Sequence, residues 1–154
     1  MKNLIVLFGL LCLFSAPLNV SAQSDSVEVL NVVQKLFDAI EQQDSIAFRA
    51  LFAEDAMKYI AIVRNGEVIR TMSGAAAGRV PNSPGEKLLE TMRSKGVQVE
   101  VHGKMAMAWV PYDFTINGEF SHCGIDACTL VKLGQEWKFA LIAYTVEYDQ
   151  CGDW

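Results

Sequence analysis

The sequence predicts an α+β domain in which two or three N-terminal helices pack on one face of a curved antiparallel sheet. Apolar residues at helical spacing occur only before Gly96, and from Val97 onward the segments alternate as strands do. Tight-turn dipeptides, Asn117-Gly118 and Gly134-Gln135, separate the later segments. Helices followed by a meander of long strands are typical of the α+β class.

The first 22 residues have the layout of a secretory signal peptide. Lys2 precedes an apolar run at residues 4–14, and the small-residue site Val20-Ser21-Ala22 follows. The run is shorter than the roughly 20 apolar residues that span a bilayer. We therefore expect cleavage after Ala22, a mature domain at residues 23–154, and a periplasmic or extracellular location with no membrane segment in the mature form.

The charge of the mature chain argues against two classes of partner. Removing Lys2 with the leader takes the formal net charge from −5 to −6, and no run of Lys or Arg remains. Nucleic acids and anionic lipids are therefore not expected partners.

The two histidines, His102 and His122, fall on separate predicted strands, and no phosphate-cradling loop occurs. The sequence thus predicts neither a metal site nor a cofactor.

Three segments carry helical signals. In residues 26–43 apolar side chains recur at helical spacing, and Asp44 suits the N-cap of a short second helix. Residues 86–95 are the third predicted helix, because their apolar residues share one side and Gly96 follows.

Residues 57–72 predict a β-hairpin between the second and third helices, turning at Asn65-Gly66. Residues 73–85 then show no period and consist largely of Gly, Ala, Ser and Pro. Two interpretations stay open for this stretch: a mobile flap over a pocket, or a long exposed loop.

Four strands complete the predicted domain. Their expected bounds are 97–101, 104–116, 119–133 and 136–148, with His102-Gly103 as the first turn.

The two tight turns fix a provisional register for the last three strands. Pairing Ile116 with Glu119 and Leu133 with Glu136 brings five rows of side chains onto one face. From one end to the other the rows are Met105/Leu130/Phe139, Met107/Cys128/Leu141, Trp109/Asp126/Ala143, Pro111/Gly124/Thr145 and Asp113/His122/Glu147. This apolar-to-ionisable gradient suits a cone with an apolar tip and a mouth that admits solvent or a ligand.

The same register predicts the site residues. The predicted pocket for a small, largely apolar ligand is lined by Trp109, Met107, Asp113, Leu141, Phe139, Thr145 and Glu147. The opposite face carries small residues and tyrosines and is too apolar to remain wet. We expect it to form a homodimer interface through Tyr112, Tyr144 and Tyr148.

His122 and Asp126 are the candidate catalytic residues. A histidine between Asp113 and Glu147 has a raised pKa and can act as a general acid, while the deeper Asp126 can act as a general base. The alternative, favoured interpretation of the His122 row is a cross-strand salt bridge at a solvated strand end, since structural ion pairs also perturb pKa.

Three cysteines follow the expected cleavage site: Cys123, Cys128 and Cys151. The first two lie five residues apart on one predicted strand, so their side chains face opposite ways and cannot pair. Cys151 lies past the last strand and is free to curl back. Cys123–Cys151 is the expected disulfide in an oxidising compartment.

The later strands resemble one branch of the nuclear transport factor 2-like proteins, of the SnoaL-like and lumazine-binding type. The resemblance is carried by the runs Trp109–Phe114, Gly118–Ala127, Trp137-Lys138 and Tyr144–Glu147, and by Cys151. It implies a cone-shaped curved sheet wrapped on helices, also called the cystatin-like fold, and a dimer. Members of this branch are often exported.

Enzymes with this fold place an acid/base carboxylate or histidine inside the cone, and His122 and Asp126 match that location best. They include ketosteroid isomerases, scytalone dehydratase, polyketide cyclases and epoxide hydrolases. Three functions therefore remain open. The leading one is an exported, cofactor-free domain that binds a small apolar molecule. The others are an isomerase, dehydratase or cyclase that uses Asp126 and His122, and a structural or protein-binding dimer.

Overall fold

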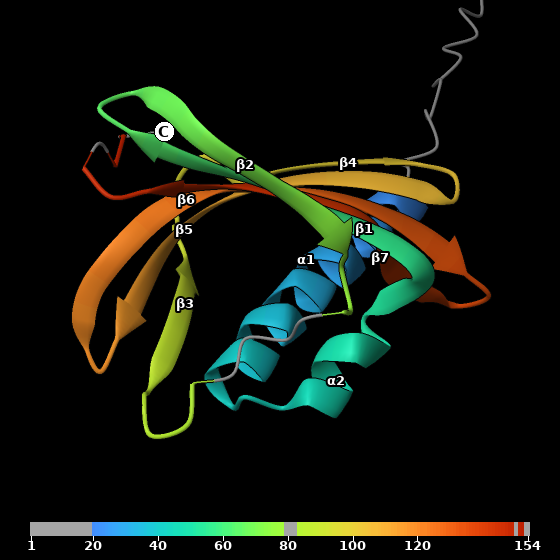
Figure 1. Ribbon diagram of the computed structural model, residues 1–154. Coiled ribbons are helices and arrows are strands. Elements are labelled where there is room, and N and C mark those ends of the chain that lie inside the picture. The colour runs from blue at the N-terminus through green and yellow to red at the C-terminus, as the bar shows by residue number, and fades with distance from the viewer. Residues whose placement is uncertain (1–19, 79–82, 150, 153–154) are drawn as a thin grey trace, which may run out of the picture.

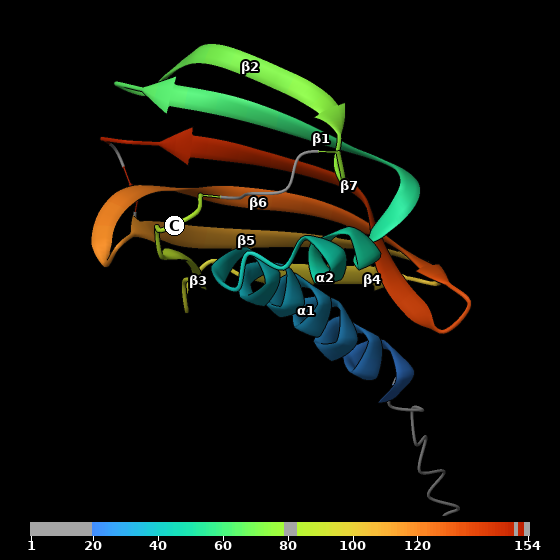
Figure 2. The same ribbon diagram turned by 60° about the horizontal axis from the view of Figure 1, so that its bottom comes forward.

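The computed structural model describes residues 20–78, 83–149 and 151–152, with the side chains of 20–22 left out (Figure 1). One curved seven-stranded sheet arches over two helices. The strand order is β2 (Glu67–Ala75), β1 (Phe52–Arg64), β7 (Glu136–Glu147), β6 (Glu119–Leu133), β5 (Met105–Ile116) and β3 (Leu88–Met92), and β4 (Gln98–His102) also pairs with β5. Both helices lie on the concave side, as Figure 2 shows from below. The predicted α+β class with a curved sheet on N-terminal helices is confirmed. The sheet is mixed rather than purely antiparallel, because β1 and β7 run parallel.

The expected signal peptide lies largely in residues 1–19, outside the described residues. The first described element, α1 (Val20–Glu41), includes the three residues before the expected cleavage site. No helix in the described part of the chain is long and apolar enough to cross a membrane.

The two predicted N-terminal helices are present. Helix α1 buries Val29, Val33 and Phe37 against the sheet, which matches the predicted apolar stripe. The second helix, α2 (Ser45–Ala50), begins at Asp44, whose carboxylate accepts bonds from the backbone N–H groups of Ile46 and Ala47. Such a cap satisfies backbone donors that have no partner within the helix.

The first hairpin consists of β1 (Phe52–Arg64) and β2 (Glu67–Ala75). Its turn is the predicted Asn65-Gly66, with φ values of 52° and 75°. Positive φ at both central residues marks a turn whose twist matches that of the flanking strands. Strand β2 runs past the predicted end of the hairpin, and residues 79–82 of the predicted flap or loop lie outside the described residues.

The third predicted helix, residues 86–95, is wrong. This segment contains β3 (Leu88–Met92), which pairs with residues 112–116 of β5 (Met105–Ile116). Strand β4 (Gln98–His102) covers only residues 105–109 of that edge. An isolated helix of about ten residues is marginal in water. The uncovered half of β5 instead offers the segment a ladder of backbone hydrogen bonds.

Strands β5, β6 (Glu119–Leu133) and β7 (Glu136–Glu147) form the predicted meander. Both turns pair as expected, Ile116 with Glu119 and Leu133 with Glu136. Each hairpin then contains a register shift, beside Phe114 in the first and between Thr129 and Leu130 in the second. An extra residue on one strand moves every later pair by one position, so the predicted rows beyond each shift are wrong.

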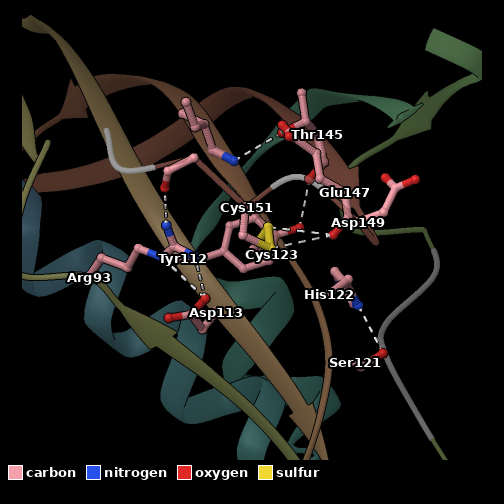
Figure 3. The surroundings of a disulfide bond; sticks show 12 residues. Arg93, Tyr112, Asp113, Ser121, His122, Cys123, Thr145, Glu147, Asp149 and Cys151 are labelled. Carbon is pink, nitrogen blue, oxygen red and sulfur yellow. Dashed lines mark hydrogen bonds and ion pairs between the residues drawn. A yellow bond between two sulfur atoms is a disulfide. The ribbon is translucent and has the colours of Figure 1, made fainter. Parts of the chain in front are cut away.

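A disulfide ties the C-terminal segment to the first half of β6 (Figure 3). It joins Cys123 and Cys151, the pair favoured by the sequence, with a Cα–Cα distance of 5.8 Å. Beside it, Arg93 bonds the Asp113 carboxylate at 2.7 Å and the carbonyl oxygen of Gly152 at 2.7 Å. Cys128 is buried and unpaired.

Candidate functional site

A cavity of about 350 Å³ opens on the concave side of the sheet. That volume lies within the range of small-molecule sites. Most of its wall is aliphatic or aromatic. The lining residues are Ile40, Phe48, Phe52, Lys58, Ile60, Ile62, Met72, Ala76, Glu90, Tyr112, Phe114, His122, Asp126, Ile142, Tyr144, Val146 and Tyr148.

Three predicted pocket residues lie outside this cavity, on the convex face. The exposed fractions of Trp109, Met107 and Leu141 are 45%, 46% and 39%. In the observed register Trp109 pairs with Ala127 rather than with Asp126, because of the shift in the first hairpin. The predicted inward orientation of these side chains is therefore wrong.

The other predicted lining residues are not in the cavity wall either. Asp113 is bound by Arg93, and the Thr145 hydroxyl accepts from the Ile125 N–H and donates to the Glu147 carboxylate (Figure 3). Phe139 is fully buried in the core.

The three tyrosines assigned to a dimer interface point the other way. Tyr112, Tyr144 and Tyr148 all line the cavity. The small residues of the same face, Ala106 and Ala108, are almost completely buried in the core to which α1 contributes. The concave face is apolar because it holds the core and the cavity, so the predicted placement of the dimer surface is wrong.

Among the described residues, Asp126 is the one polar or charged residue, apart from tyrosine, whose side chain is buried. Only 2% of it is exposed, and it lies on β6 between Val110 of β5 and Tyr144 of β7. Its Oδ2 atom is buried without a protein donor among the described groups. Burial raises the pKa of Asp126 to about 7.

Glu90 is the functional candidate that sequence reasoning missed. It comes from β3 and lines the cavity, where its carboxyl hydrogen-bonds with that of Asp126. Burial and then the neighbouring Asp126 raise the pKa of Glu90 well above its usual value. Two carboxyl groups can share a hydrogen bond only if one carries a proton, so the pair holds one proton between them. The signal for Glu90 was concealed by its assignment to a helix.

Tyr112 and Gly124 together form the wall beside this pair. The Tyr112 ring crosses Gly124 and its hydroxyl donates to the Thr145 carbonyl oxygen at 2.7 Å. A Cβ at position 124 would lie 2.1 Å from that oxygen and 2.8 Å from the ring. Burial, with the nearby Asp126 and Glu90 carboxyls, raises the pKa of the Tyr112 hydroxyl, so it remains a neutral donor.

His122 lies in an aromatic part of the cavity wall. Its ring stacks on Phe114 at 4.7 Å and meets Tyr112 edge-on at 5.9 Å, while Nδ1 is 3.1 Å from the Ser121 hydroxyl. Burial lowers the pKa of His122, contrary to the predicted rise, because Asp113 and Glu147 lie on the other face. Four strand positions place its Cα about 13 Å from that of Asp126, so the structure does not bring the two predicted catalytic residues together.

No group of three or more His, Cys, Asp and Glu side chains is arranged to hold a metal ion within the described ranges. The carboxyl pair has only two members.

The fold is the nuclear transport factor 2-like fold, in which a curved sheet surrounds a concave cavity. Residues 24–145 match the family described as "putative lumazine-binding", so the chain belongs to that family. No curated protein matches the chain.

Solved structures show the same fold at low identity. One is an NTF2-like protein of unknown function from Shewanella baltica OS155, with TM-score 0.61, 18% identity, and coverage of 85% of this chain and 100% of that one. Another is the β subunit of a "putative aromatic-ring-hydroxylating dioxygenase" from Novosphingobium aromaticivorans, with TM-score 0.65, 10% identity, and coverage of 83% and 92%. A third is a "putative dehydratase" of the NTF2-like family from Streptomyces avermitilis, with TM-score 0.60, 14% identity, and coverage of 80% and 96%.

Proposed function

We propose that this protein binds a small, largely apolar molecule in its concave cavity. The observation that carries the proposal is the cavity itself: about 350 Å³ lined mainly by aliphatic and aromatic side chains, with the Glu90–Asp126 pair as a polar site. Sites for small ligands have this composition, with a few polar groups that fix orientation. Membership of a family described as lumazine-binding supports a small-molecule ligand.

Thermal-shift and calorimetric titration with neutral aromatic compounds test the proposal. Val146 lines the cavity, whereas Leu141 on the same strand lies on the convex face. Val146→Trp is expected to abolish binding because the indole occupies the cavity, and Leu141→Trp to leave it unchanged. Equal binding by both variants, or no binding by the unmodified protein, would refute the proposal.

A second candidate function is acid–base catalysis of the isomerase, dehydratase or cyclase type. It is favoured by Asp126, whose pKa of about 7 suits a general base near neutrality. Glu90 lies nearer to Asp126 than His122 does, so Glu90 is the candidate for the general acid. With a responsive substrate, Asp126→Asn is expected to lower kcat by orders of magnitude. An unchanged rate would eliminate this candidate.

The exported location also belongs to the proposal. The signal-like N-terminus supports it, and the Cys123–Cys151 disulfide is typical of an oxidising compartment. Mass spectrometry of protein recovered outside the cytoplasm is expected to show Gln23 as the first residue. An intact Met1 there, or retention in the cytoplasm, would contradict it.

A further inference from the structure

The polar site in the cavity leaves one acceptor of the described residues, the Oδ2 atom of Asp126, without a hydrogen-bond donor. An ionised carboxylate accepts up to about four hydrogen bonds. Among the described residues, Asp126 interacts with the Glu90 carboxyl, while its Oδ2 atom is buried without a partner. A buried acceptor without a donor is costly unless a ligand or water supplies one. The structure therefore calls for a donor on the cavity side of Asp126.

The charge of the site points to the kind of donor. Within the described part of the chain, neither Glu90 nor Asp126 forms an ion pair with a basic side chain. Lys58 lines the cavity from β1, the second strand away from β6. An acidic pair in an apolar wall is stabilised by a cation that enters from outside, because charge-assisted hydrogen bonds are roughly twice as strong as neutral ones.

The aromatic rings near the pair suit the same ligand. Tyr112 and Tyr144 line the cavity and lie close enough for the carboxyls to perturb their hydroxyls. A cation held over an aromatic face gains further attraction, most strongly when it is desolvated. Other titratable or charged groups face the cavity or the pair: Lys58 from β1, His122 and Cys128 from β6, and Tyr148 after β7. Glu147 also acts on the hydroxyl of Tyr112.

We propose that the cavity binds ligands that carry a protonated amine on an aromatic body, with the nitrogen held by Glu90 and Asp126 and the body held against the apolar wall. This inference rests on the proposed function and adds the chemical class of the ligand. An anionic ligand would instead place a second negative charge beside a carboxyl pair that shares one proton, and a neutral hydroxyl would supply a donor without charge.

Three probes with one ring system test the proposal: 1-naphthylmethylamine, 1-naphthalenemethanol and 1-naphthoic acid. Calorimetric titration is made just above neutral pH, where the amine is still protonated. We expect the amine to bind at least about tenfold more tightly than the alcohol, and the acid to bind most weakly, because one charge-assisted bond replaces a neutral one.

Variants identify the group responsible. Asp126→Asn keeps the size of the side chain and removes its charge, and it is expected to reduce the preference for the amine to within about threefold while the alcohol still binds. Glu90→Gln is expected to give a smaller reduction. Asp55→Asn, at an exposed position of β1, is the matched control and keeps the full preference. Circular dichroism establishes that each variant is folded before titration.

The outcomes separate this inference from the function on which it rests. If the alcohol binds as tightly as the amine, the cation site is refuted and the apolar pocket stands. If the preference survives in Asp126→Asn, the amine binds elsewhere on an acidic surface, and the inference is again refuted. If no probe binds, the pocket function itself fails.

Discussion

At the residue scale, two positions decide what the cavity can do: Asp126, which brings charge into it, and Gly124, which lets Tyr112 cross the sheet. Asp126 was recognised from the sequence because a carboxylate in an apolar strand requires a reason. Its partner Glu90 was not, since Leu88-Leu89-Glu90-Thr91-Met92 fits both a helix and a strand. Only the pairing with β5 places Glu90 in the cavity wall.

The raised pKa of Asp126 predicts how stability depends on pH. An unfolded aspartate titrates near pH 3.9, whereas Asp126 in the fold titrates at about 7. The folded state therefore holds this proton more tightly. Its contribution to stability is fully present below about pH 4 and is lost as the pH rises through 7, by up to about 4 kcal/mol.

Urea denaturation at several pH values measures this dependence. The free energy of unfolding of Asp126→Asn is expected to fall less between about pH 4 and 8 than that of the unmodified protein. Asp55→Asn serves as a control for a surface carboxylate. Parallel pH profiles for all three proteins would show that Asp126 is not held protonated by the fold.

Gly124→Ala is expected to destabilise the fold by about 1–3 kcal/mol or more. The added Cβ would lie 2.1 Å from the Thr145 carbonyl oxygen, which is backbone and cannot move without opening β6 from β7. Gly74→Ala in β2 meets nothing within 4 Å and is the matched control. A shift of the urea midpoint confined to Gly124→Ala confirms the prediction, and equal midpoints would contradict it.

At the element scale, the local signals that succeeded are those that act within a few residues. Asn65-Gly66 and Asn117-Gly118 adopt positive φ at both positions, as their dipeptides predict, and Asp44 caps α2. The helix predicted at residues 86–95 failed because a distant strand edge determines its structure. The predicted register of β5, β6 and β7 is wrong beyond the two shifts, because no turn residue indicates where those shifts occur.

The disulfide gives a prediction for the C-terminal segment. Closing a loop with a sequence separation of 28 residues stabilises a fold by about 3–4 kcal/mol in the chain-entropy account. The double variant Cys123→Ala/Cys151→Ala is expected to lose that amount in urea denaturation. A reductant should lower the midpoint of the unmodified protein and leave that of the double variant unchanged. A midpoint of the unmodified protein that does not respond to reductant would show that the bond contributes little.

At the scale of the whole molecule, the convex face carries a group of exposed apolar residues. Met107 and Trp109 of β5, Leu141 of β7, and Met57 and Tyr59 of β1 lie there, each more than a third exposed. The homodimer stays a prediction, and this face replaces the tyrosine face as its surface. Apolar patches of this kind mark interaction sites.

Light scattering after size exclusion tests the dimer. We expect two copies per particle for the unmodified protein and one for Trp109→Glu, because a charge in the centre of an apolar interface is desolvated without a partner. Ile46→Glu, on the helix side and 82% exposed, should stay dimeric. A monomeric unmodified protein would refute the prediction.

The sequence alone determined the two N-terminal helices, the first hairpin, the last four strands, the tight turns, the cap of α2 and the pair of cysteines that meet. Each of these depends on residues close in the chain or on the direction of one strand. Only the tertiary structure decided which face of the sheet is concave. Alternating positions of β5 are apolar on both sides, so its hydrophobic pattern does not select a face, and a shift of one residue exchanges inside for outside. The surroundings of Asp126 also differ from the prediction. It shares the cavity with Glu90 and three tyrosines, whereas Trp109 and Glu147 lie outside the cavity.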